Sequence, residues 1–331
     1  MDQPRVSIVI VTADRCGDLR RCLGELRTHV DKEQTLSVEV LTVHAPHDGL
    51  SMAMVREEYP WVAVHVAAAR HIGRQRNLGA QKANGDVLVY LDDDAWPRPG
   101  WLRELIAAFD DARVVAASGP VFRGDGSLQC ERLAASPLGR IVPVKGSAPT
   151  PRGMSPTFSG CNLAISRRAL FACGGFDENL VYQPDDMDMC CRLFAAAGRS
   201  ANAMCYRPHA AVNHESSPGP FRRNLQDRAW FTVARDNVYF GFKHAGAVRA
   251  LLCAGLLQVP KLARFFMWMV RGRLGPLACL RCVVKHLSGT LAGHAKGLCR
   301  RAALPLRPLP PAAVTTTSAP SAMPCRPPQP V

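Results

Sequence analysis

The C-terminal part of the chain is marked by the absence of acidic residues. Residues 241–331 hold 13 Lys and Arg side chains and neither Asp nor Glu, whereas residues 1–240 hold 28 basic side chains and all 27 acidic ones. The formal net charge of +14 therefore belongs almost entirely to the C-terminal third. This asymmetry predicts a nearly neutral globular part followed by a basic extension.

The chain also lacks the segments that would place it across or outside a membrane. Arg249 and Lys261 interrupt the most apolar stretch, which falls short of the roughly 18 residues that a spanning helix needs. No signal-peptide pattern precedes the first expected strand, which begins at Val6. The 13 cysteines are scattered through apparent core positions such as Cys161 and Cys173. We therefore expect a cytoplasmic protein with reduced thiols.

Short apolar runs that are expected to form buried strands alternate with helical patterns in the N-terminal third. The runs are residues 6–12, 37–43, 62–66 and 87–91, and a helix with Asp18 as its N-cap follows the first of them. This order predicts an α/β fold with a doubly wound, mostly parallel sheet flanked by helices. The first strand-to-helix turn reads TADRCGD and lacks G-x-G-x-x-G, which argues against a dinucleotide-binding oxidoreductase.

Three adjacent carboxylates, Asp92, Asp93 and Asp94, follow the last of these runs in the stretch LVYLDDDAWP. Adjacent acids repel one another and lose hydration when buried, so a fold keeps them together only with a compensating cation. Oxygen ligands suit Mg²⁺ or Mn²⁺. Side chains two apart in extended backbone point the same way, so we expect Asp92 and Asp94 to face one site and Asp93 to face elsewhere. The alternative is a solvated acidic turn.

A second acidic cluster opens a predicted helix in the stretch PDDMDMCCRL. Carboxylates in a first turn are favoured by the helix dipole. Asp188 and Arg192 are four residues apart in the favourable order, which predicts a structural ion pair. Asp185 and Asp186 have no such partner nearby, so one of them is expected to cap the helix and the other is available as a base.

The composition divides the chain into three regions. Residues 1–220 form the α/β domain, in which the Gly-, Pro- and Ser-rich residues 122–157 are expected to be a long, mobile connection. Residues 221–303 are expected to form a basic amphipathic helical extension, with one helix ending at Pro260. Residues 304–331 are rich in Pro, Ala and Thr and are expected to be disordered.

Two roles are open for the extension. Its helices can pack on the α/β domain, or residues 241–303 can lie on an anionic membrane surface. Apolar residues that would add burial in the membrane are Leu256, Phe265, Phe266 and Trp268. Nucleic acid is not expected as a partner, because stacking aromatics and base-reading polar groups are not interleaved with the charges.

Five motifs occur in an order that resembles family 2 inverting glycosyltransferases of the GT-A fold. They are VSIVIVTADR, GRQRNLGAQKANGD, YLDDDA, SGCNLAISRRALFACGGFDE and the acidic pair within PDDMDMCCRL, and they cover roughly residues 5–215. The resemblance implies that residues 1–220 are a glycosyltransferase catalytic domain. It also implies a nucleotide-sugar donor, a divalent metal (Mg²⁺ or Mn²⁺) and net inversion at the anomeric carbon.

The same resemblance implies a metal site built from two parts of the chain. The family's DXD motif falls on Asp92, Asp93 and Asp94. By the resemblance Asp94 would bind the metal, and Asp92 would lie near the ribose or a metal-bound water. A late His often completes the metal shell in the family, and His214 in AVNHESS is the candidate.

The family's acidic pair before the final helix falls on Asp185 and Asp186, which implies that Asp186 is the general base. The acceptor would be a glycan or lipid-linked glycan, which suggests an enzyme peripheral to the cytoplasmic face of the membrane. The alternative is a catalytically inactive peripheral membrane or nucleic-acid binding protein built on a transferase-like domain.

Further residues are implied in donor binding. Thr12 and Asp14 fall where the family's first loop touches the nucleotide base, and Arg76 and Asn77 fall on its Arg-Asn pair beside the donor. Many relatives carry an Asp-rich turn after the second strand, where this chain reads VHAPHDG. The Asp that would bind uracil or ribose is therefore missing or shifted to Asp48, and the sequence does not identify the nucleotide.

Overall fold

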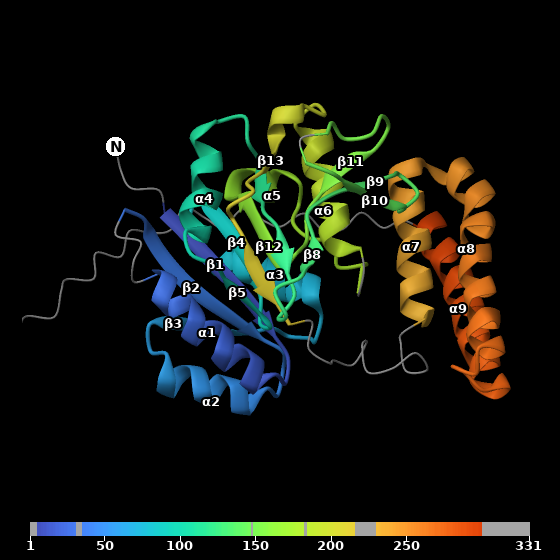
Figure 1. The fold of residues 1–331 in the computed structure, drawn as a ribbon, viewed down its shortest axis with the longest axis horizontal. Helices are drawn as coiled ribbons and strands as arrows, with labels where there is room; N and C mark the ends of the chain where they lie inside the picture. Colours follow the sequence, from blue (N-terminus) through green and yellow to red (C-terminus); the bar gives the residue numbers. More distant parts are fainter. Residues whose placement is uncertain (1–4, 31–34, 147, 182–183, 216–229, 300–331) are drawn as a thin grey trace, which may run out of the picture.

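The structure, a computed structural model, describes residues 5–30, 35–146, 148–181, 184–215 and 230–299 (Figure 1). An α/β domain holds the N-terminal part of the chain, and three long helices lie together at one side of it. The expected disorder of residues 304–331 falls outside the described residues.

The α/β domain is organised by a seven-stranded sheet with the order β13-β6-β12-β4-β1-β2-β3. β12 runs antiparallel to both of its neighbours, and the other strands of this sheet pair in parallel. The prediction of a doubly wound, mostly parallel sheet is confirmed. The strands are β1 (Arg5–Thr12), β2 (Ser37–His44), β3 (Val62–Val66), β4 (Val87–Asp92), β6 (Ala116–Ser118), β12 (Asn162–Ser166) and β13 (Met204–Tyr206).

Helices cover both faces of this sheet. Strand β4 carries apolar side chains on both of its faces, as is typical of a strand that is buried on both sides. Val89 and Leu91 pack into the core on one face, and Leu88 and Tyr90 pack into the core on the other. The helices that contribute to the first core are α1 (Cys16–Val30), α2 (Gly49–Glu58) and α4 (Trp101–Ala107). Those that contribute to the second core are α3 (Ile72–Lys82), α5 (Arg167–Ala172) and α6 (Asp185–Ala196).

The carboxyl ends of the central strands meet at one edge of the sheet. Thr12 at the end of β1 pairs with His44 at the end of β2, and Val11 pairs with Asp92 at the end of β4. Open α/β sheets bind ligands outside the carboxyl ends of their strands. The three carboxylates after β4 therefore lie at the edge where a ligand site is expected.

The expectation of a long, mobile connection over residues 122–157 is wrong. This segment contributes short strands to two small sheets, with the orders β10-β9-β11 and β5-β14-β7-β8. The glycines mark turns between them, as at Gly139, whose φ of 82° suits the turn from Ser136 to Arg140. The strands are β5 (Ala95–Pro97), β7 (Val121–Phe122), β8 (Leu128–Cys130), β9 (Arg132–Ala135), β10 (Ile141–Val144), β11 (Ser155–Thr157) and β14 (Val212–His214).

Within its described residues, 230–299, the extension forms three helices, α7 (Trp230–Ala245), α8 (Ala247–Val270) and α9 (Pro276–Leu298). Helix α8 continues through Pro260, so the expected helix end there is wrong; a proline removes one backbone hydrogen bond without necessarily ending a helix that is held by its neighbours. None of the described helices is long and apolar enough to cross a membrane.

Buried charges fix the extension to the α/β domain. Asp188 of α6 is fully buried and lies 2.8 Å from each of Arg192 Nε, Lys243 Nζ and His244 Nε2. Burial alone would raise the pKa of Asp188, but these cationic and hydrogen-bonding neighbours hold it well below its usual range. Lys243 also contacts Asp177 at 2.7 Å. The predicted Asp188–Arg192 pair is confirmed, and α7 adds two further partners to it.

Glycines bring α9 against α7. A Cβ at Gly289 would lie 2.1 Å from the Phe231 carbonyl oxygen, and one at Gly293 would lie 2.6 Å from the Arg235 carbonyl oxygen. Only glycine allows this approach of the two backbones. The packing on the α/β domain that was left open for the extension is therefore confirmed for α7, and one face of α9 packs on α7.

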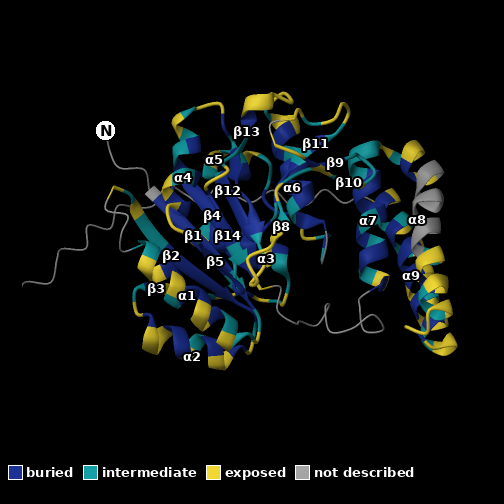
Figure 2. Ribbon diagram, in the orientation of Figure 1, coloured by how far each residue is buried: buried dark blue, intermediate teal, exposed yellow. Residues whose placement is uncertain are grey.

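The other face of α9 remains exposed (Figure 2). Its apolar residues recur at alternating spacings of three and four: Leu277, Leu280, Val284, Leu287 and Leu291, each between 45 % and 71 % exposed. Exposed cations lie on α9 and on the preceding turn and helix, namely Arg264, Arg271, Arg273, Arg281 and Lys285.

The apolar residues expected to face a membrane are only partly available. Phe266 is 62 % exposed, but Phe265 is fully buried, with its ring centroid 4.6 Å from that of Trp230. Trp268 also packs on Trp230. Leu256 lies outside the described side chains. Part of the apolar surface that the sequence led us to expect at a membrane is therefore buried against α7.

Candidate functional site

The three carboxylates after β4 are held by two different arginines. Strand β4 ends at Asp92, and Asp93 and Asp94 form a turn. Arg15 lies 2.8 Å from both Asp93 and Asp94, whereas Asp92 lies 3.3 Å from Arg76. Asp93 does not turn away from Asp94, because the two-residue alternation of a strand does not extend into a turn and Arg15 binds both carboxylates. That Asp92 and Asp94 face one site stays a prediction.

Arg15 compensates the buried pair Asp93 and Asp94, each about 97 % or more buried. The Thr12 hydroxyl also donates to Asp93 at 2.7 Å. Burial raises the pKa of Asp93 to about 7, against the lowering effect of Arg15. Burial would likewise raise the pKa of Asp94, but His214 and Arg15 hold it well below its usual range. Sequence reasoning gave Arg15 no role, although its place directly after β1 puts it at the same sheet edge as the carboxylates.

Arg76 joins the two acidic clusters into one site. Its guanidinium lies 2.5 Å from Asp185 on α6 and 3.3 Å from Asp92 at the end of β4, and the residue is 2 % exposed. Gly160 makes room for it, since a Cβ there would lie 2.4 Å from Arg76 Nη2. Burial raises the pKa of Asp185 to about 7 although Arg76 favours the ionised form. Asp185 thus serves as a buried partner for Arg76 rather than as a helix cap.

Asp186 is placed differently from its neighbour. It is half-buried, and its Oδ2 accepts a hydrogen bond from the Gly160 backbone N–H at 2.9 Å. Its Oδ1 accepts from the Met187 N–H at 2.7 Å. The Gly160 loop therefore contacts both Arg76 and Asp186, which orients the carboxylate of Asp186 beside the other acidic cluster.

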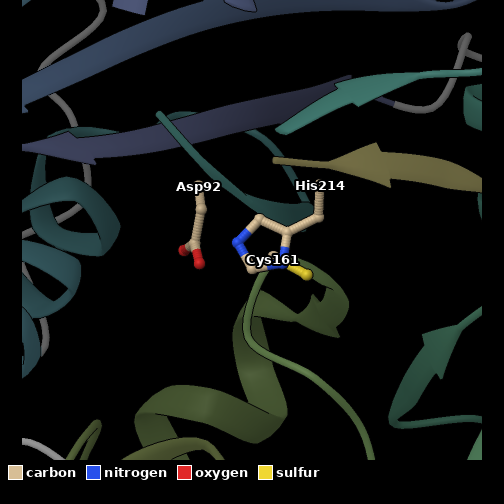
Figure 3. A group of neighbouring side chains, drawn as sticks. All are labelled: Asp92, Cys161 and His214. Atoms are coloured by element: carbon tan, nitrogen blue, oxygen red, sulfur yellow. The ribbon is translucent and has the colours of Figure 1, made fainter. Parts of the chain in front are cut away.

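His214 reaches the same site from β14, where it pairs with Ala95. Its Nε2 lies 3.1 Å from Asp94 Oδ1, and its Nδ1 lies 3.2 Å from Gln129 Nε2. Asp92, Cys161 and His214 each offer one ligand atom, and these three atoms lie within 4.8 Å of one another (Figure 3). Carboxylate oxygens and imidazole nitrogen are ligands for divalent cations such as Mn²⁺. The residues present therefore fit a divalent cation.

The remaining residues expected at the donor site have different environments. Asp14 is exposed and binds Arg70 at 2.6 Å. Asp48 is 2 % exposed and lies 3.4 Å from His44 Nδ1, so its carboxylate faces the interior instead of the surface. Asn77 is buried too, and its side-chain amide exchanges hydrogen bonds with the Phe176 backbone at 2.8 and 2.9 Å. Asp48 and Asn77 thus have partners within the protein, and their expected contact with the donor stays a prediction.

Residues 7–171 match the family model described as glycosyl transferase family 2. The chain is 26 % identical over 258 residues to a pre-mycofactocin glycosyltransferase of Mycobacterium tuberculosis, covering 74 % of this chain and 48 % of the relative. It is 24 % identical over 154 residues to a glucosyl-dolichyl phosphate glucuronosyltransferase of Haloferax volcanii, covering 44 % of this chain and 48 % of the relative. The chain thus spans about half the length of these curated relatives.

Two solved structures have a similar fold. GalNAc-T7 with UDP, GalNAc and Mn²⁺ matches with a TM-score of 0.53 and 18 % identity, covering 72 % of this chain and 48 % of that one. A mannosyltransferase of Pyrobaculum calidifontis in complex with GDP-Man and Mn²⁺ matches with a TM-score of 0.51 and 17 % identity, covering 90 % and 88 %. These likenesses confirm the expected GT-A-like fold.

Proposed function

Because the chain belongs to glycosyl transferase family 2, we propose that it transfers a sugar from a nucleotide-diphosphate sugar to an acceptor hydroxyl, with inversion at the anomeric carbon. The observation that carries the proposal is the bridge made by Arg76. It brings Asp92 and Asp185 to one guanidinium, so the two carboxylate clusters belong to one site. Transfer needs two acidic groups with separate tasks, and both lie here.

The first cluster would hold a divalent cation, Mg²⁺ or Mn²⁺, through Asp92, Asp94 and His214. When bound, the cation neutralises the charge that develops on the departing nucleoside diphosphate. Neighbouring side chains of the protein orient these ligands. Arg15 holds Asp94, and Gln129 lies 3.2 Å from the second ring nitrogen of His214. Such outer contacts fix the orientation of metal-binding side chains.

The second cluster would activate the acceptor. An acceptor hydroxyl has too high a pKa to attack unaided, so a positioned carboxylate takes its proton as the new bond to the anomeric carbon forms and the bond to the diphosphate breaks. Asp185 is fully engaged with Arg76. Asp186 is half-buried and is held by backbone N–H groups, which leaves its carboxylate the better placed of the two to accept a proton.

Donor turnover tests this function against the alternative of an inactive binding protein. We expect the purified protein to hydrolyse one nucleotide sugar slowly in a panel of UDP-, GDP- and dTDP-sugars, and only when Mn²⁺ or Mg²⁺ is present. Hydrolysis in the absence of acceptor arises because water can occupy the acceptor position. If no donor in the panel binds or turns over, the inactive alternative is correct.

The acceptor is proposed to be a glycan or a lipid-linked glycan at the cytoplasmic face of a membrane. The exposed face of α9 supports this location, since its apolar row, together with the exposed cations of α9 and of the turn and helix before it, matches the two components of an anionic bilayer. Two copies of the chain would bring like charges together at this face, whereas anionic headgroups would neutralise them. A bilayer is therefore the favoured occupant.

Replacing Leu280 and Leu287 together with Glu should weaken binding to phosphatidylglycerol vesicles by at least about tenfold. Burying one such side chain contributes roughly 1.5–3 kcal/mol, and the new charges repel the headgroups. Sedimentation with vesicles at low salt measures the effect. The matched control is Leu50→Glu on α2, where the leucine is 80 % exposed and lies in the α/β domain. If wild-type protein does not bind anionic vesicles at low salt, the membrane location is wrong and this face packs against protein instead.

A further inference from the structure

Cys161 lies inside the candidate cation site, where the expected ligands are oxygen and nitrogen. Its side chain is 1 % exposed, and its sulfur is one of the three ligand atoms that lie within 4.8 Å of one another together with those of Asp92 and His214. Figure 3 shows the three side chains close together, although each comes from a different part of the chain.

The backbone that carries Cys161 is held firmly by the next residue. Asn162 accepts from Trp101 Nε1 at 2.8 Å through its side-chain oxygen, and its amide donates to the Ala210 carbonyl at 2.8 Å. The Asn162 carbonyl also accepts from the Ser118 hydroxyl at 2.5 Å. These buried contacts fix the backbone next to Cys161, and the Ser159 hydroxyl lies 3.2 Å from the sulfur itself. Such support favours a preorganised ligand set.

We propose that Cys161 contributes a sulfur ligand to this site, which then accepts thiophilic divalent cations such as Zn²⁺ and Co²⁺ beside Mn²⁺. This inference rests on the proposed function, which gives the position of the cation. It adds a sulfur ligand and a metal preference to the proposed cation site. Two carboxylates, one imidazole and one thiolate are a mixed donor set of the kind that holds Zn²⁺ and Co²⁺, whereas Mg²⁺ prefers oxygen alone. As the sulfur–cation bond forms, the thiol proton leaves to solvent and no electron is transferred.

Cobalt substitution tests the sulfur ligand directly. Full-length protein titrated with Co²⁺ should develop a near-ultraviolet absorption band from sulfur-to-cobalt charge transfer. Cys161→Ala should lose this band and bind Zn²⁺ at least about tenfold more weakly, the lower limit for losing even an outer-shell partner. Its Mg²⁺ affinity should stay within about twofold, because Mg²⁺ makes little use of sulfur.

Two further variants serve as controls for the sulfur ligand. Cys161→Ser keeps the size of the side chain and should also lose the band, which separates loss of sulfur from loss of folding. Cys205→Ala on β13, a half-buried cysteine at the edge of the sheet, should keep it. Co²⁺ binding without the band, or a band that survives in Cys161→Ala, overturns the sulfur ligand while the proposed cation site stands. Failure of the wild type to bind any divalent cation overturns both.

Discussion

Replacing Asp186 with Asn should lower kcat by a factor on the order of 10²–10⁴, the usual contribution of a general base. Asn keeps the size of the side chain and can still accept one of the two backbone N–H hydrogen bonds that orient Asp186. It cannot take the proton of the acceptor hydroxyl, so the rate of the chemical step falls while the affinity for the donor stays nearly unchanged. Steady-state transfer rates and donor titration, measured on the same preparation, separate the two effects.

Asp185→Asn is the matched control, because it changes the adjacent carboxylate in the same way. Asp185 is the buried partner of Arg76, and breaking a buried pair of this kind typically destabilises a protein by about 3–5 kcal/mol. We expect this variant to show a lower free energy of unfolding in urea, and Asp186→Asn to show little change. If Asp185→Asn loses more kcat than Asp186→Asn while its stability is unchanged, the assignment within the pair is reversed.

The elements that carry local signals could be predicted from the sequence. The apolar run of β4 is buried on both faces and ends in carboxylates, so both the parallel sheet and its ligand edge follow from it. The first turn of α6 and its Asp188–Arg192 pair also depend on residues four apart. Each of these features is set by neighbours in the chain.

The parts that sequence did not predict depend on distant contacts. Arg76 was expected beside the donor, but the Asp185 that it binds lies 109 residues further along the chain. Arg15 ends the first motif, but its partners Asp93 and Asp94 lie almost 80 residues later, and it reaches them only when β1 and β4 pair. The small sheets in residues 122–157 consist of strands of two to four residues, too short to show a period.

Asp94→Ala should abolish transfer. Asp94 is 2 % exposed and lies between Arg15 at 2.8 Å and His214 Nε2 at 3.1 Å, so its carboxylate sits where the cation is proposed to bind. Removing it deprives the cation of a ligand and leaves the charge on the departing diphosphate without its main compensation. Asp111→Ala is the control, because Asp111 is a half-buried acid paired with Arg113 and lies outside the site.

The carboxylates after β4 are proposed to hold a cation that binds the donor diphosphate. Calorimetric titration with UDP and GDP, with and without Mn²⁺, measures this cation's contribution. Wild-type protein should bind one of the two more tightly when Mn²⁺ is present, and Asp94→Ala should bind that nucleotide equally with and without the metal. An undiminished Mn²⁺ effect in Asp94→Ala would contradict the claim and remove Asp94 from the site.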